Sequence, residues 1–495
     1  MKQYDKESGR LSPRTGLGML SGTIAIFIAE ALILPTGFVT AVFLARRLGP
    51  VGYGLFALAS TVIVFAEWGC TAIFSNTTVK FISEAKDDWG PVATTVSRLY
   101  VLAGIAMAVL LFFLAQPLAL LFAEPAMAGY LRLFALDVPI VSLGSANINI
   151  LLGRGCFQKR ALISASRCLA RLILIILFVE LGFSVAGAIM GSIGASVVEL
   201  AISCLYVRLR FFSRTSFPAG KLWGFAVPLF MNSLCIRLLK LDLFVLKALG
   251  ATAAEVGFYS AATNLSIPPS LLSASLSPPL LSTLSGLLGE GRDERAKEIG
   301  RTAIRSVFWL LPFAAMTAGA SSEIVNFIFG QTFLPAGPML ALLIFATVGL
   351  HATSVANALL TASHRPGLTL VLTVPIVLLS FVGYLFAIPT FGGIGAASVM
   401  AAGACFIGFG SILMACRIWS TRWPSGDFLK CILCSLFAYG LTVLWPASGW
   451  VVVVKVIIIA VAILVAFLLL GLFTSRERAL LRSLLSMRFR ENRMG

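Results

Sequence analysis

Long apolar runs recur from one end of the chain to the other, and they limit the folds that it can adopt. Each run holds about 18 residues or more, which is enough for a helix to cross the ~30 Å hydrocarbon core of a bilayer. Together they predict an all-α polytopic membrane protein with about fourteen transmembrane helices. The runs lie at residues 18–43, 51–75, 96–122, 131–152, 161–181, 184–207, 221–249, 256–285, 302–329, 336–362, 367–388, 392–415, 428–446 and 450–473.

The composition favours lipid over water as the surroundings of this chain. Of the 495 residues, 59% are hydrophobic and 12% are charged, whereas soluble domains carry about 25% charged residues. A soluble enzyme, a disordered scaffold and a secreted disulfide module are therefore disfavoured. The nine cysteines are scattered through apolar runs without the spacing of a zinc site, so we expect neither a metal nor a cofactor.

The net charge of +17 is concentrated in alternate connections between the runs. By the positive-inside rule these connections are cytoplasmic, which places both termini in the cytoplasm. The basic positions are Lys2, Lys6, Arg10, Arg14, Lys80, Lys86, Arg154, Lys159, Arg160, Arg208, Arg210, Arg214, Lys221, Arg292, Arg295, Lys297, Arg301, Arg365, Arg417, Arg422, Lys430 and the tail from Arg476 to Arg493.

Three sequence stretches occur twice in the same order, which indicates an internal duplication. RRLGPVGYGLFALA at 46–59 resembles KALGATAAEVGFYSAA at 247–262, NILL at 149–152 resembles NALL at 357–360, and GAIMGSIGAS at 187–196 resembles GAASVMAAGA at 395–404. The offset of about 200 to 208 residues corresponds to six helices. An even number puts both copies in the membrane in the same sense, so the two lobes should be related by a pseudo-two-fold axis along the membrane normal, with a central cleft.

These boundaries predict six parts. They are a cytoplasmic arm at 1–17, a first six-helix lobe at 18–210, a cytoplasmic linker at 211–222, a second six-helix lobe at 223–416, two extra C-terminal helices at 417–475 and a basic cytoplasmic tail at 476–495.

Charged residues inside the apolar runs are the candidates for function, because an ionisable group in the hydrocarbon costs a few kcal/mol and generally faces a cavity or a partner. Arg160, Arg167 and Arg171 lie within about 40° of one another on one helix face. The alternative for them is snorkelling toward the headgroups, which becomes strained at Arg171.

Further charges lie in the predicted helix 221–249 and at the end of the first helix. Arg237, Lys240 and Lys247 project within roughly 80° of one another, while Asp242 points about 140° away from Arg237. Arg46 and Arg47 either complement the helix dipole or form a rim that attracts phosphate.

The bases cluster on faces and the acids are scattered, which favours an anionic substrate. The predicted substrate-binding cations are Arg46, Arg98, Arg167, Arg171, Arg237 and Lys240. The acids, which either pair with these bases or take up a coupling ion, are Asp242, Glu30, Glu67, Asp137 and Glu199. Since the loops carry no Walker A, HExxH or GxSxG signature, we expect no enzyme activity.

Six strings in order resemble one family of membrane proteins. They are ARRLGPVGYGLFALA (45–59), KLDLFVLKALGATAAEVGFYSAATNL (240–265), SPPLLSTLSGLLGEG (277–291), FGQTFLPAGPMLALLI (329–344), LLTASHRPGL (359–368) and FGGIGAASVM (391–400). The chain resembles the polysaccharide exporters and lipid-linked oligosaccharide flippases of the multidrug/oligosaccharidyl-lipid/polysaccharide superfamily.

The resemblance implies movement of an undecaprenyl-diphosphate-linked oligosaccharide across the bacterial plasma membrane by alternating access through a cationic central cavity. The cargo is then a repeat unit of O-antigen, capsule or exopolysaccharide, and the expected partners are membrane lipids and a polysaccharide polymerase with its chain-length machinery, not nucleic acid. Two alternatives remain open at this point. One is a cation-coupled multidrug or metabolite antiporter, and the other is a non-transporting scaffold of a glycan assembly complex.

Overall fold

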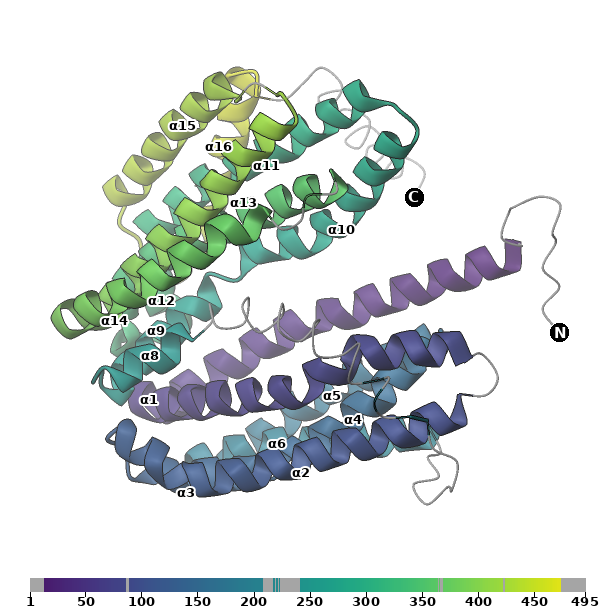
Figure 1. Ribbon diagram of the computed structural model, residues 1–495. Helices are drawn as coiled ribbons and strands as arrows, with labels where there is room; N and C mark the ends of the chain where they lie inside the picture. The colour runs from purple at the N-terminus through teal and green to yellow at the C-terminus, as the bar shows by residue number, and fades with distance from the viewer. Residues whose placement is uncertain are drawn as a thin grey trace, which may run out of the picture. The chain divides into compact units, whose positions relative to one another are not determined.

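The computed structural model is helical throughout the residues that it describes, which contain no β-strand. These residues are 13–85, 89–207, 217–218, 220, 222, 241–363, 365, 368–421 and 423–472. Figure 1 shows the long helices that make up most of the structure. The chain divides into two compact units, Met1–Ser260 and Ala261–Gly495, because most contacts between residues lie within one unit or the other.

Apolar residues of α1, α2 and α4 supply most of a buried core in the first unit. Phe74 on α1, Tyr100 on α2 and Ile150 on α4 are among its fully buried side chains. Alongside them, α5 packs against α6 and α1. The helices of this unit are α1 (Pro13–Ala85), α2 (Gly90–Leu121), α3 (Ala126–Ala135), α4 (Asp137–Gly153), α5 (Phe157–Phe178), the short π-helix η1 (Val179–Phe183), α6 (Ser184–Tyr206), α8 (Asp242–Ala248) and α9 (Ala253–Leu265), which runs on into the second unit.

The second unit packs α13 along α14 and α15 along α11. Its core brings together Phe308 of α11, Val355 of α13 and Phe467 of α16. The remaining helices are α10 (Pro268–Gly289), α11 (Asp293–Gly319), α12 (Ser321–Phe329), the 3-10 helix η2 (Gln331–Phe333), α13 (Ala336–Ala362), α14 (Leu368–Ile418), α15 (Ser425–Leu444) and α16 (Val451–Leu469).

Three of the longest helical stretches are interrupted at glycine. Gly49 in α1, Gly182 in η1 and Gly392 in α14 have φ angles of 68°, 92° and 56°. Glycine adopts such positive φ angles without a steric penalty, so two helices can follow each other directly with a sharp turn between them. The turns fall in or beside the gaps between predicted apolar runs.

Eight helices in the described part of the chain are long and apolar enough to cross a membrane. Three of them hold 52, 50 and 48 residues, about twice the length that one span needs, and each contains one of the glycine turns. The protein is therefore a multi-pass helical membrane protein, while the number of about fourteen spans stays a prediction. The eight are Leu34–Ala85, Gly90–Leu121, Ala126–Gly153, Phe157–Tyr206, Ala336–Ala362, Val371–Ile418, Ser425–Leu444 and Val451–Leu469.

Two expectations differ from the structure around the predicted run 302–329. The gap that separates this run from the preceding run 256–285 is partly helical, because α11 already begins at Asp293. Asp293 and Glu294 stand in the first turn, where negative charge complements the helix dipole, and Glu294 pairs with Lys297 at 2.8 Å. At the other end, the expected single span 302–329 is bent by 66° between α11 and α12.

The division between the units also falls later than the predicted linker at 211–222. Because α8 packs on α1, residues up to Ser260 group with the first unit. At the N-terminal end, α1 begins at Pro13, inside the predicted arm 1–17.

Candidate functional site

Charged side chains from four helices of the first unit meet inside the apolar bundle. We call Glu67, Asp137, Arg167, Arg171 and Glu199 the charge cluster. Nη1 of Arg167 on α5 lies 2.9 Å from Oε2 of Glu199 on α6. Glu67 on α1 and Asp137 on α4 both interact electrostatically with the two arginines. The cluster thus brings together two of the predicted cations and three of the predicted acids.

The sequence of α5 sets the depth of the two arginines. They follow Phe157, the first residue of α5, by ten and fourteen positions, which is about 15 and 21 Å along the helix axis. One turn of helix separates them, so they share a face. Arg171 interacts electrostatically with Glu67 on α1 and Asp137 on α4, so it belongs to the same cluster as Arg167.

The acids and the bases of the cluster differ in their access to solvent. Asp137 is 2% exposed and Glu199 is 3% exposed. The side chain of Arg167 is 35% exposed, and Arg171 is exposed as well. The two arginine side chains are therefore more accessible than Asp137 and Glu199, while Glu67 is half-buried.

Asp137 is only partly satisfied. The Ser196 hydroxyl lies within hydrogen-bonding range of its carboxylate, but its Oδ1 atom is buried and has no hydrogen-bond partner among the described residues. With three carboxyl groups and two guanidinium groups, the cluster has one acid more than its bases can neutralise.

Other predicted site residues lie outside this cluster. Arg46 is exposed at the end of the first part of α1, and the neighbouring Arg47 pairs with Glu180 on the surface of η1. Arg98 is half-buried in α2. Asp242, the first residue of α8, accepts a hydrogen bond of 2.6 Å from the Tyr259 hydroxyl.

Three predicted site residues remain. Arg237 and Lys240 lie outside the described residues, and the side chain of Glu30 lies outside the described side chains. Their roles stay predictions.

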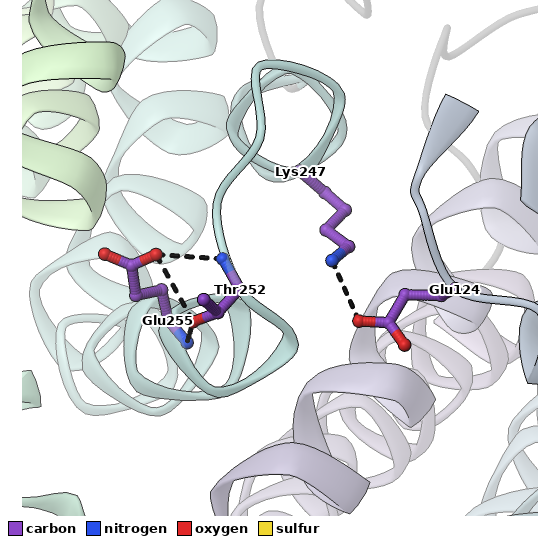
Figure 2. A network of polar contacts seen from close by, with 4 residues as sticks. All are labelled: Glu124, Lys247, Thr252 and Glu255. Atoms are coloured by element: carbon purple, nitrogen blue, oxygen red, sulfur yellow. Dashed lines mark hydrogen bonds and ion pairs between the residues drawn. The ribbon is translucent and has the colours of Figure 1, made fainter. Parts of the chain in front are cut away.

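A second polar network ties α8 to the connection between α2 and α3 (Figure 2). Nζ of Lys247 lies 3.0 Å from Oε1 of Glu124, and the lysine side chain is only 5% exposed. Close by, Thr252 and Glu255 form a capping box at the start of α9, in which the Glu255 carboxylate accepts a bond of 2.9 Å from the Thr252 backbone N–H. Lys247 is thus a buried ion-pair residue.

Glycines allow α1 and α9 to approach closely beside this network. A Cβ atom on Gly54 would overlap the Ala253 carbonyl oxygen, and one on Gly257 would overlap the Pro50 carbonyl oxygen. The contact is reciprocal, and its residues come from the duplicated stretches 46–59 and 247–262. The two copies of the motif therefore pack against each other.

Two ion pairs that were not predicted from the sequence attach α15 and α16 to other helices of the second unit. Lys455 of α16 is fully buried, with Nζ 2.6 Å from Oε2 of Glu323 on α12. Arg305 of α11 pairs with Asp427 of α15 at 2.8 Å. A signal was present at Lys455, because a lysine within the run VVVVKVIIIA requires a buried partner.

Comparisons with known proteins give one family and one fold. A family model described as polysaccharide biosynthesis protein matches residues 43–338. The succinoglycan biosynthesis transport protein ExoT of Rhizobium meliloti is 26% identical over 314 residues, which are 62% of this chain and 61% of ExoT. The match therefore spans less than two thirds of that relative.

Two solved structures share the fold. The lipid II flippase MurJ in an inward closed conformation superposes with a TM-score of 0.71 at 17% identity, covering 90% of this chain and 98% of MurJ. An inward-facing multidrug resistance transporter of the MATE family has a TM-score of 0.61 at 16% identity, covering 82% of this chain and 98% of the transporter. At these identities the likeness concerns the fold.

Proposed function

Because the chain belongs to the polysaccharide biosynthesis protein family, we propose that it translocates an undecaprenyl-diphosphate-linked oligosaccharide across the bacterial plasma membrane. The cargo is a repeat unit of O-antigen, capsule or exopolysaccharide. The similarity to a succinoglycan transport protein and the fold shared with a lipid II flippase support this proposal.

The charge cluster is the observation that carries the proposal in physical terms. A diphosphate cannot cross hydrocarbon alone, because it would lose its hydration without compensation. Arginine replaces that hydration well, since its planar guanidinium forms bidentate, charge-assisted bonds to phosphate oxygens. Arg167 and Arg171 offer such groups deep within α5 while remaining accessible.

In the proposed mechanism the sugar and the diphosphate pass through a hydrated groove while the polyprenyl tail stays in lipid. Two lobes of six helices rock against each other, so that the groove opens to one side of the membrane at a time. Both termini lie in the cytoplasm, and Arg46, Arg98, Arg237 and Lys240 are the further cations that bind the substrate in this proposal.

Replacing both accessible arginines tests this function. The change Arg167→Ala with Arg171→Ala should reduce surface glycan in the native host by at least about tenfold, because charge-assisted bonds to the diphosphate contribute about 1.5–3 kcal/mol each. Lipid-linked repeat units should accumulate on the cytoplasmic side. Arg292→Ala is the control, since it removes an exposed ion pair with Glu290 in the other unit.

The alternatives give different results in the same host. If the protein is a scaffold of a glycan assembly complex, the double arginine variant retains normal glycan output. If it is a cation-coupled antiporter, deletion sensitises cells to organic cations and leaves the lipid-linked pool unchanged. Either result would contradict the proposed function.

A further inference from the structure

Glu199 forms an ion pair with Arg167, one of the two arginines that the proposed function assigns to the substrate's diphosphate. Its Oε2 atom lies 2.9 Å from Nη1 of Arg167 in an ion pair, and a carboxylate and a phosphate compete for the same guanidinium group. Arg167 therefore has an anion bound to it in this structure, and a diphosphate that engages Arg167 must compete with Glu199.

Among the described residues, Arg167 is the only ion-pair partner of Glu199. From α1 and α4 it faces the carboxyl groups of Glu67 and Asp137. From α4 it also faces Gly144, where a Cβ atom would lie 3.7 Å from the carboxylate and which has no side-chain donor. On α5 the ionisable neighbours are Arg167 itself, Cys168 and Arg171, and Arg171 lies close to Glu67 and Asp137.

Release of Glu199 from Arg167 would leave a charge in an unfavourable place. The residue is 3% exposed, and burial of an unpaired carboxylate beside two further carboxyl groups is strongly unfavourable. Binding one proton from solvent converts the carboxylate to a neutral carboxyl group and removes this cost. The proton balance is then one proton taken up for each diphosphate that displaces Glu199.

We infer that Glu199 is an internal substitute for the substrate's phosphate, which holds Arg167 in the empty site and takes up a proton when a prenyl diphosphate displaces it. The inference rests on the proposed function and adds a coupling to it: cargo binding and proton binding at Glu199 strengthen each other. Diphosphate affinity therefore falls as pH rises.

Calorimetry of the purified full-length protein in lipid nanodiscs tests the exchange, with farnesyl diphosphate as the probe. Titrations at one pH in two buffers of different ionisation enthalpy count the protons bound with the ligand. The wild type should take up about one proton more per ligand than Glu199→Gln. The variant should also bind the probe about tenfold more tightly, because the competing anion is gone.

Two further variants separate exchange from a structural role. Glu199→Asp keeps a titratable group and should keep the extra proton, whereas a structural role would make the Asp and Gln variants behave alike. Glu290→Gln removes a carboxylate from an exposed ion pair with Arg292 and should match the wild type in both affinity and proton count.

The outcomes distinguish this inference from the proposed function. Equal proton counts for wild type and Glu199→Gln, with both binding the probe, would overturn the exchange and leave the diphosphate site intact. Unchanged affinity in Arg167→Ala with Arg171→Ala, or no binding to the wild type, would overturn the proposed function and the exchange with it.

Discussion

Single charged residues determine which helices pair in this apolar chain. Lys455 lies within the most hydrophobic helix that could span a membrane and is fully buried, yet its ammonium group is compensated by Glu323. Glu323 is less deeply placed, at 21% side-chain exposure, and it also accepts a 3.0 Å bond from the Ala447 N–H. The two partners of this ion pair are therefore not equivalent.

This asymmetry predicts unequal costs for removing each partner. Glu323→Ala leaves a buried unpaired ammonium and should destabilise the second unit by about 3–5 kcal/mol. Lys455→Met should cost clearly less, because Glu323 keeps its backbone donor and some solvent. Thermal unfolding of the purified variants in one detergent measures both, and equal losses would show that the pair is not buried as described.

At the same scale, α5 shows what the spacing of residues can predict and what it cannot. The spacing of Arg167 and Arg171 predicted that they share a helix face, and the structure places both in the charge cluster. Spacing could not predict that Glu199 would be the partner of Arg167. That pairing depends on how α6 is rotated and shifted along α5, which residues distant in sequence decide together.

At the level of elements, glycine determines both where helices turn and where they touch. Proline marks one helix start, because α10 begins at Pro268 after a break that follows Leu265. The turns at Gly49, Gly182 and Gly392 instead use positive φ angles. A break of this kind is local, which explains why the gaps between apolar runs predicted it.

The contact between α1 and α9 predicts a strong effect of a single methyl group. Gly54→Ala would drive a Cβ atom into the backbone of Ala253, and overpacking of this kind costs about 1–3 kcal/mol. Transport measured by surface glycan should fall together with thermal stability. The control is Gly286→Ala in α10, where an added Cβ has open space and helix propensity improves. Equal behaviour of the two variants would contradict the close contact.

At the scale of the whole molecule, each unit contains most of one copy of the duplicated sequence. The boundary between the units, however, does not coincide with the boundary between the copies. The segment from Asp242 to Ser260 groups with the first unit, although it begins the second copy. The Lys247–Glu124 ion pair and the glycine contact explain this, because both attach the segment to elements of the first copy.

The distribution of basic residues predicts the orientation of the whole chain. A fluorescent protein fused after Gly495 should fluoresce, because the C-terminus is predicted to be cytoplasmic. Alkaline phosphatase fused after Ser448, in the connection between α15 and α16, should be active, because that connection is predicted to lie outside. An inactive phosphatase fusion there, with an active one after Gln158, would reverse the predicted topology.

The sequence by itself determined that this chain crosses a membrane repeatedly as helices and to which family it belongs. A bilayer requires every span to satisfy its own backbone hydrogen bonds, so each apolar run indicates its structure locally and independently of the others. Only the tertiary structure decided which charges meet: Glu199 with Arg167, Lys247 with Glu124 and Lys455 with Glu323. Such pairs depend on the rotation and axial shift of packed helices, and packing of many side chains sets these quantities at once.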